Sequence, residues 1–147
     1  MLVSACLIGR YCRYDGRTNE DRVLERELER EHQRAVPFCP EEHGGLGTPR
    51  PPASIHGGDA HAVLDGRAQV RSDSGADLSP AFLAGARGAL EVCREHGIRR
   101  AYLKERSPSC GVRNTHADGE LVPGPGVTSA LLARAGIDVR GIEGRRD

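Results

Sequence analysis

The sequence contains no tryptophan, and aromatic residues make up only 3% of its 147 positions. So little aromatic surface cannot form a stacking platform for exposed bases, which argues against a single-stranded nucleic-acid binder. Strong charge of either sign is also missing, since 21 basic and 21 acidic residues give a formal net charge of zero. A neutral chain has no overall attraction to a polyanion or an anionic membrane. These features favour a small-molecule partner, with no nucleic acid and no membrane.

Long apolar runs and a regular cysteine framework are missing as well. The apolar run near the start covers residues 2–8, far fewer than the ~20 residues of a membrane-spanning helix. An odd number of widely spaced cysteines does not suit a secreted disulfide scaffold. We therefore expect a cytoplasmic protein with reduced cysteines, which are Cys6, Cys12, Cys39, Cys93 and Cys110.

The pattern of apolar residues predicts one α/β domain over residues 1–147. Short apolar runs at 2–8, 35–39, 98–103 and 137–139 are typical of buried strands. Helical patterns lie between them at 19–33, 79–97 and 128–135. No repeat, low-complexity segment or linker divides the chain. This alternation predicts a mainly parallel, Rossmann-like sheet with helices on both faces.

Several local features refine this prediction. Residues 61–70, with Asp65-Gly66 at their centre, have the two-residue turn signature of a small β-hairpin. Residues 41–52 predict a loop, and residues 141–147 a frayed tail. Thr18 or Asn19 is the expected cap of the 19–33 helix. Ser79-Pro80 and Gly97 mark the ends of the longest helix.

Three cysteines are predicted to meet at one edge of the sheet. Cys6 and Cys39 end the first two predicted strands, and Cys110 lies in the loop after the third. The carboxyl ends of parallel strands form the ligand crevice of such a sheet. Three thiolates with one open position suit a soft metal or an iron–sulfur cluster. Small buried hydrophobes that happen to end strands are the alternative interpretation.

The other two cysteines are interpreted differently. Cys12 lies near Cys6 and can serve as a fourth ligand, which would make a closed zinc site. The chain lacks the Cys-x-x-Cys spacing that such zinc sites favour. Cys93 lies on the apolar face of the 79–97 helix, where a core role is expected.

Acid–base and cationic residues lie close to these cysteines in the sequence. Glu41 follows Cys39 by two positions and is a candidate general base or a solvated carboxylate. Ser107 and Ser109 flank Pro108 and can pass a proton or simply form a turn. Cations that can bind an anionic or carbonyl oxygen are present at Arg13, Arg50 and Lys104, and Asp15-Gly16 is also typical of a turn.

The glycine-rich segment 124–128 precedes a helix and has some likeness to a phosphate-binding loop. It lacks the lysine of a P-loop, and no Gly-x-Gly-x-x-Gly follows the first strand. We interpret it as a structural turn.

Taken together, these segments resemble the 2-thiouracil desulfurase family, a bacterial family long classed as a domain of unknown function. The resemblance covers nearly the whole chain. Its specific motifs are Ser4-Ala5-Cys6-Leu7, Arg13-Tyr14-Asp15-Gly16, Cys39-Pro40-Glu41, Pro49-Arg50, and Lys104 with Ser107-Pro108-Ser109-Cys110-Gly111.

The resemblance implies a [4Fe–4S] cluster held by three cysteines, with the fourth iron open to sulfur. By matching positions, the ligands would be Cys6, Cys39 and Cys110, with Cys12 outside the cluster. Glu41 and a serine of the 107–109 loop match the positions that the resemblance implies for general acid–base catalysis. The positions implied for substrate binding are Arg13, Asp15, Arg50 and Lys104.

The expected function is therefore desulfuration of a thiolated nucleobase such as 2-thiouracil, by a hydrolytic reaction without net redox change. Two other classes remain open. A structural or binding domain with a closed four-cysteine zinc site would use Cys12 as a ligand. A cluster-free sulfur carrier would hold a persulfide on one reactive cysteine, with Cys110 the best candidate.

Overall fold

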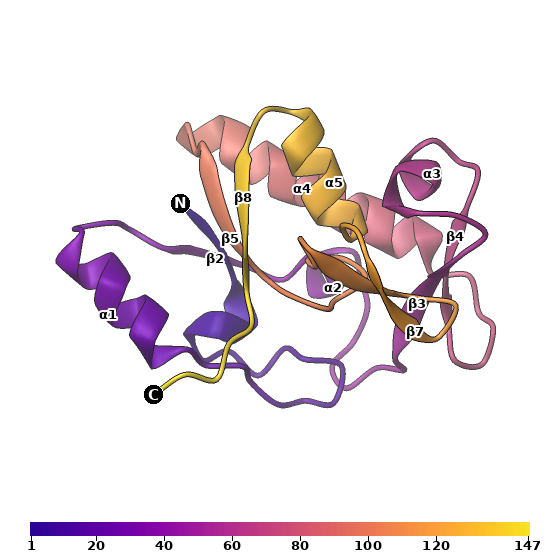
Figure 1. Ribbon diagram of the computed structural model, residues 1–147, viewed down its shortest axis with the longest axis horizontal. Coiled ribbons are helices and arrows are strands. Elements are labelled where there is room, and N and C mark those ends of the chain that lie inside the picture. Colours follow the sequence, from indigo (N-terminus) through magenta and orange to yellow (C-terminus); the bar gives the residue numbers. More distant parts are fainter.

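The computed structural model describes residues 1–147 and contains a four-stranded parallel sheet (Figure 1). Its strands lie in the order β2-β1-β5-β8, and every neighbouring pair is parallel. The predicted parallel α/β architecture is therefore confirmed. The strands are β1 (Leu2–Ser4), β2 (Val36–Phe38), β5 (Arg100–Lys104) and β8 (Asp138–Ile142).

Helices cover both faces of this sheet because neighbouring residues of β1 point to opposite sides. Leu2 packs with residues of α4 (Ser79–His96) and α5 (Val127–Arg134). Val3 packs on the other side with Leu24 and Leu28 of α1 (Arg22–Arg30). The parallel sheet thus separates two apolar clusters, and a third cluster, which includes Ile55, Phe82 and Val127, packs α4 and α5 against the second sheet.

A second four-stranded sheet was not predicted. Its strand order is β4-β3-β6-β7, with β3 and β6 parallel and the outer pairs antiparallel. Figure 1 shows it beside α5, away from α1. The strands are β3 (Ala53–His56), β4 (Gln69–Ser72), β6 (Asn114–Ala117) and β7 (Glu120–Pro123).

The predicted hairpin over residues 61–70 is wrong. The first half is helix α3 (Ala60–Leu64), because the Asp59 side chain caps it by accepting a hydrogen bond from the Ala62 amide at 2.9 Å. Ala60 and Val63 then pack on the core at helical spacing. Gly66, with φ of +79°, ends the turn, and β4 pairs with β3 instead.

Several predicted boundaries also shift. The first strand ends at Ser4, and the chain continues as the 3₁₀ helix η1 (Ala5–Ile8). Asp21, rather than Thr18 or Asn19, caps α1 by accepting from the Leu24 amide at 2.9 Å. The 79–97 helix is confirmed, with Gly97 in the left-handed conformation at its end. None of the helices combines the length and hydropathy needed to cross a membrane.

The carboxyl-terminal segment is ordered by specific contacts, so the predicted frayed tail is also wrong. Gly141 and Ile142 belong to β8. The Arg145 amide donates to the Asn19 carbonyl at 3.2 Å, and the Arg146 guanidinium pairs with Asp21 at 2.8 Å. The segment therefore holds down the chain that precedes α1.

A short helix replaces the start of the predicted 41–52 loop and packs closely on α4. This helix, α2 (Pro40–His43), begins directly after Cys39. A methyl group at Gly85 of α4 would collide with the Pro40 carbonyl. The absence of a side chain at Gly85 therefore allows α2, which carries Glu41, to pack closely against α4.

We expect Gly85→Ala to destabilise the protein by about 1–3 kcal/mol, because overpacking forces α2 away from α4. Within a helix, a glycine-to-alanine change otherwise stabilises by up to ~1 kcal/mol. The sign of the change in the free energy of unfolding, measured with urea, is therefore diagnostic. A gain in stability would show that α2 is free to move.

Candidate active site

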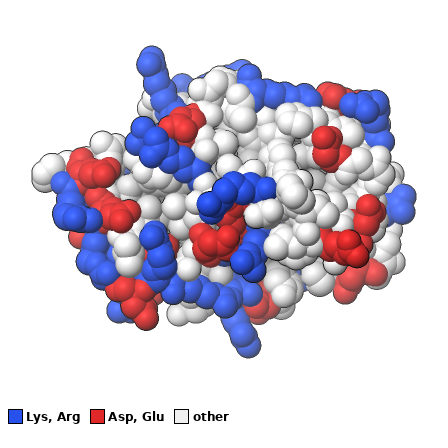
Figure 2. All heavy atoms as spheres, viewed as in Figure 1, with Lys and Arg blue, Asp and Glu red and all other residues white.

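A single cavity of about 600 Å³ lies at the carboxyl ends of β1, β2 and β5. Four of the five cysteines line it, and the fifth, Cys93, is buried in α4 away from it. Figure 2 shows acidic and basic side chains interspersed on one face of the molecule, in keeping with its zero net charge. The cysteines that line the cavity are Cys6, Cys12, Cys39 and Cys110.

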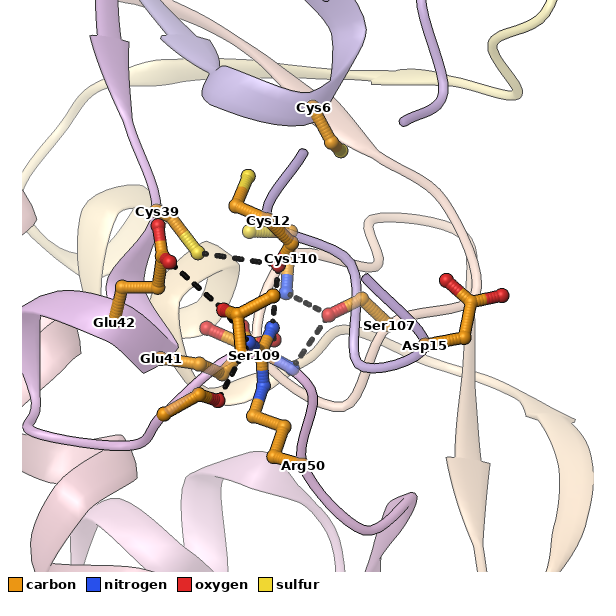
Figure 3. A network of polar contacts seen from close by, with 12 residues as sticks. Cys6, Cys12, Asp15, Cys39, Glu41, Glu42, Arg50, Ser107, Ser109 and Cys110 are labelled. Carbon is orange, nitrogen blue, oxygen red and sulfur yellow. Dashed lines mark hydrogen bonds and ion pairs between the residues drawn. The ribbon is translucent and has the colours of Figure 1, made fainter. Parts of the chain in front are cut away.

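The local structure explains how each thiol reaches the cavity. Cys6 lies in η1 directly after β1, and Cys39 is the residue before the first turn of α2. Cys110 lies in the loop between β5 and β6, where Gly111 approaches the Asn114 carbonyl too closely for any side chain. All are free thiols, and Figure 3 shows them around one space.

Cys12 lies among the other thiols, on the loop before α1. Its sulfur, the sulfur of Cys39 and a carboxylate oxygen of Glu42 lie within 4.8 Å of one another. Contact with Cys39 and Cys6, together with burial, raises the pKa of Cys12. The Cys39 thiol in turn donates to the Cys12 carbonyl at 3.8 Å.

Hydrogen-bond donors face the other three sulfurs. The Cys12 hydrogen bond, with help from Asn19, lowers the pKa of Cys6 to about 7 despite burial. Cys12 and the Glu42 backbone N–H lower the pKa of Cys39. Burial raises the pKa of Cys110 well above its usual value, and a hydrogen bond with Ser4 acts against this.

Glu41 forms a buried ion pair with Arg50 at the edge of the cavity (Figure 3). The Arg50 guanidinium donates to Glu41 Oε2 at 2.9 Å and to the Cys12 carbonyl at 2.8 Å. Glu41 Oε1 has no hydrogen-bond partner in the protein. One carboxylate oxygen is thus anchored, while the other is free to accept a hydrogen bond from a water or substrate.

The two candidate serines are placed very differently. Ser107 lines the cavity, and its Oγ accepts from the amides of Ser109 and Cys110 at 3.1 and 3.0 Å. Its own hydroxyl hydrogen therefore remains available to the cavity. Ser109 is fully buried outside the cavity, and its hydroxyl bonds to Thr128 at 2.8 Å. Of the two predicted serines, only Ser107 lines the cavity, and Ser109 packs inside the fold.

The predicted substrate-binding residues also divide into two groups. Arg13, Arg50 and Lys104 line the cavity, whereas Asp15 does not. Asp15 pairs with Arg13 at 2.9 Å and so holds the guanidinium in place. Burial lowers the pKa of Lys104, whose ammonium donates to the Glu105 carbonyl at 2.9 Å.

The glycine-rich segment before α5 is a structural turn, as predicted. The first amides of α5 donate to the carbonyls of Pro108 and Ser109, at 2.9 and 2.8 Å. The amino end of this helix is therefore capped by the loop that carries Cys110, which leaves no free amides there for a phosphate.

Glu105 is a buried carboxylate at the site that the sequence pattern did not reveal. It is 1% exposed, and its carboxylate accepts from the amides of Val112 and Arg113 at 2.8 and 3.0 Å and from the Arg113 side chain at 2.7 Å. A methyl group at Gly141 would collide with this carboxylate. Glu105 thus closes the loop that carries Cys110.

We expect Glu105→Gln to lower the free energy of unfolding by about 1.5–3 kcal/mol at pH 7, the value of hydrogen bonds to a charged group. Burial opposes the charge, but the Arg113 and backbone hydrogen bonds outweigh it and lower the pKa of Glu105. The carboxylate therefore stabilises the fold above its unfolded pKa of ~4.3. This stabilisation is lost as pH falls through the folded pKa.

Urea unfolding at several pH values tests both points. The gap between wild type and Glu105→Gln should be widest near neutral pH and narrow as the solution is acidified below about pH 4. A gap that stays constant down to acid pH would show that Glu105 is not charged in the folded protein.

The sequence matches the 2-thiouracil desulfurase family over residues 1–143. The chain belongs to this family. It is 39% identical over 142 residues to the uncharacterized protein YbbK of Bacillus subtilis (strain 168), which covers 95% of this chain and 93% of that protein.

A solved structure supports the same assignment. The chain resembles the [4Fe-4S]-dependent thiouracil desulfidase TudS (DUF523Vcz), with a TM-score of 0.81 and 42% sequence identity. The match covers 96% of this chain and 89% of that one. The family resemblance, the α/β fold and the desulfurase class expected from the sequence are therefore confirmed.

Proposed function

We propose that this protein removes sulfur from a thiouracil-type base by hydrolysis, at a [4Fe–4S] cluster held by Cys6, Cys39 and Cys110. One observation carries the proposal: thiols from three separate loops and the Glu41–Arg50 pair line the same cavity. The family and the cofactor named for TudS support the same chemistry.

The residues present fit such a cluster. Sulfur donors suit iron–sulfur clusters, and the cavity is lined by free thiols that form no disulfide. Cys6, Cys39 and Cys110 each have a hydrogen-bond donor besides any thiol, from Asn19, the Glu42 amide and Ser4 respectively. The family resemblance leaves Cys12 outside the set, although its sulfur lies with Cys39 and Glu42 in a group that could hold a metal ion.

The reaction replaces a C=S bond by C=O and consumes one water, with sulfide as the other product and no electrons gained or lost. When bound, the cluster supplies an open iron position, a soft Lewis acid that accepts a thiocarbonyl sulfur. Glu41 takes a proton from the attacking water through its free Oε1. Arg50 keeps the Glu41 carboxylate oriented through Oε2 and leaves Oε1 free for the water.

The remaining cavity groups bind the base and move the second proton. The Ser107 hydroxyl can donate to a ring nitrogen or to the departing sulfur, because its oxygen already accepts two amides. Arg13 and Lys104 present cations to the exocyclic carbonyl oxygen of the base, and Asp15 acts on the substrate only through Arg13.

Purification without oxygen, followed by iron, sulfide and zinc analysis and a thiouracil assay, tests the proposal. We expect a brown protein with equal amounts of iron and acid-labile sulfide that converts 2-thiouracil to uracil and sulfide. A colourless protein that holds zinc through four thiolates would instead favour a structural domain. A metal-free protein that carries a persulfide would favour a sulfur carrier.

A further inference from the structure

A buried amide lies against the sulfur of Cys6. The side chain is that of Asn19, a residue only 5% exposed, and its Nδ2 lies 3.4 Å from Cys6 Sγ. The backbone of the same segment is fixed to Cys6 as well. The Asn19 amide and the Thr18 hydroxyl donate to the Cys6 carbonyl at 3.0 and 2.9 Å. Asn19 is therefore held at a constant position relative to this thiol.

The contacts on the other side of the amide determine which atom faces the sulfur. Asn19 Oδ1 accepts from Arg13 Nη1 at 2.9 Å and from Arg145 Nε at 3.2 Å. A guanidinium can only donate hydrogen bonds. The oxygen must therefore face the two arginines, and the NH₂ group must face Cys6. A flipped amide would place donors against donors and leave the sulfur beside an oxygen.

The two arginines are themselves positioned. Asp15 pairs with Arg13 at 2.9 Å. Arg145 belongs to the carboxyl-terminal segment, and its backbone amide donates to the Asn19 carbonyl at 3.2 Å. Segments from both ends of the chain thus contact the Asn19 side chain. Of the proposed substrate-binding residues, Asn19 contacts only Arg13.

We propose that Asn19 is a positioning residue of the cluster site, whose N–H···S hydrogen bond stabilises the Cys6 thiolate as an iron ligand and raises the reduction potential of the cluster. The inference rests on the proposed function. A hydrogen bond to a ligand sulfur withdraws electron density and favours the more electron-rich state of a cluster. Partners of this kind typically contribute about 10–100-fold to metal affinity.

Asn19 is also the best of the sulfur donors to test. The donor to Cys39 is the backbone of Glu42 and survives any side-chain change. The donor to Cys110 is Ser4, whose Oγ also accepts from the Lys104 amide at 2.9 Å and so helps to join β1 and β5. At Asn19, by contrast, a substitution can remove the hydrogen bond to the sulfur and still leave an oxygen that accepts from Arg13 and Arg145.

The test compares the reconstituted holoenzyme with Asn19→Asp, which keeps the side-chain shape but removes the N–H donor. Gln33→Glu makes the same amide-to-carboxylate change at an exposed turn and is the matched control. We expect Asn19→Asp to lower the midpoint potential and to release iron to a chelator about 10–100-fold faster. Gln33→Glu should match the wild type in both measurements.

Resonance Raman spectra in H₂O and D₂O supply a readout that a purely structural role would not move. The wild-type Fe–S(Cys) stretching bands should shift on deuteration, and Asn19→Asp should lose part of that shift. If Asn19→Asp fails to fold, Asn19→Ser, whose hydroxyl is too short to reach the sulfur, takes its place.

Two outcomes would overturn the inference, and they are distinguishable. If the wild type holds a cluster and Asn19→Asp has the same potential, iron release and deuterium shift, Asn19 has no role toward the cluster while the proposed function stands. If the wild type itself assembles no cluster, the proposed function fails and this inference fails with it.

Discussion

Cys6→Ser, Cys39→Ser and Cys110→Ser should each lose the cluster, whereas Cys93→Ser should keep it. A serine hydroxyl has a much higher pKa than a thiol and binds soft iron poorly at neutral pH. Mutation of a hydrogen-bond partner of a metal ligand typically lowers metal affinity about 10–100-fold, and loss of the ligand itself must lower it at least as much. We expect the iron content of each of these three variants to fall by at least ~10-fold.

Cys93→Ser is the matched control because it makes the same chemical change at a buried thiol outside the cavity. Cys93 packs with Ile98 and Leu90 in the layer beneath the parallel sheet. Iron and sulfide analysis of all four proteins, each shown to be folded by circular dichroism, decides the question. Equal iron loss in Cys93→Ser would mean that serine damages the fold rather than the ligand set.

Cys12 completes this series, because its sulfur lies near that of Cys39. The ligand set implied by the family resemblance does not include Cys12, so Cys12→Ala should retain iron and most of the activity. A folded but colourless Cys12→Ala protein would make Cys12 a fourth ligand. The open iron position required by the proposed reaction would then be missing.

The convergence of the cysteines could be predicted from the sequence because it depends on one general rule. Short apolar runs that alternate with helical patterns predict parallel strands, and the carboxyl ends of parallel strands meet at one edge. The structure places Cys6, Cys39 and Cys110 at that edge. The pattern could not show that Cys12 also reaches it, since Cys12 follows no strand.

The second sheet and the outer partners of the sulfurs could not be predicted for a different reason. Strands β3, β6 and β7 have only four residues each and mix polar with apolar side chains. Segments this short do not show a recognisable alternation of polar and apolar residues. Asn19 and Glu105 are buried polar residues that find partners in the folded chain, from Arg145 for Asn19 and from the Val112–Arg113 loop for Glu105. Periodicity encodes neither the contact of Asn19 with the far end of the chain nor the closing of the loop around Glu105.

Glu41→Gln should separate catalysis from cluster assembly. The glutamine keeps the size of the side chain and an oxygen for Arg50, which donates to Glu41 Oε2 at 2.9 Å. It cannot accept a proton as a carboxylate does. We expect an unchanged cluster spectrum and thiouracil turnover at least ~100-fold slower, the lower end of what general-base catalysis supplies.

The measurement is the turnover number for 2-thiouracil, with iron content determined on the same sample. Glu91→Gln, which changes an exposed carboxylate on α4, is the control for the altered net charge. Near-normal turnover by Glu41→Gln with an intact cluster would remove Glu41 from the reaction. The attacking water would then have to lose its proton to another group in the cavity, of which the Ser107 hydroxyl is one. A Glu41→Gln protein without iron would instead assign the ion pair with Arg50 to assembly of the site, since both side chains are then needed to hold the Cys39 turn in place.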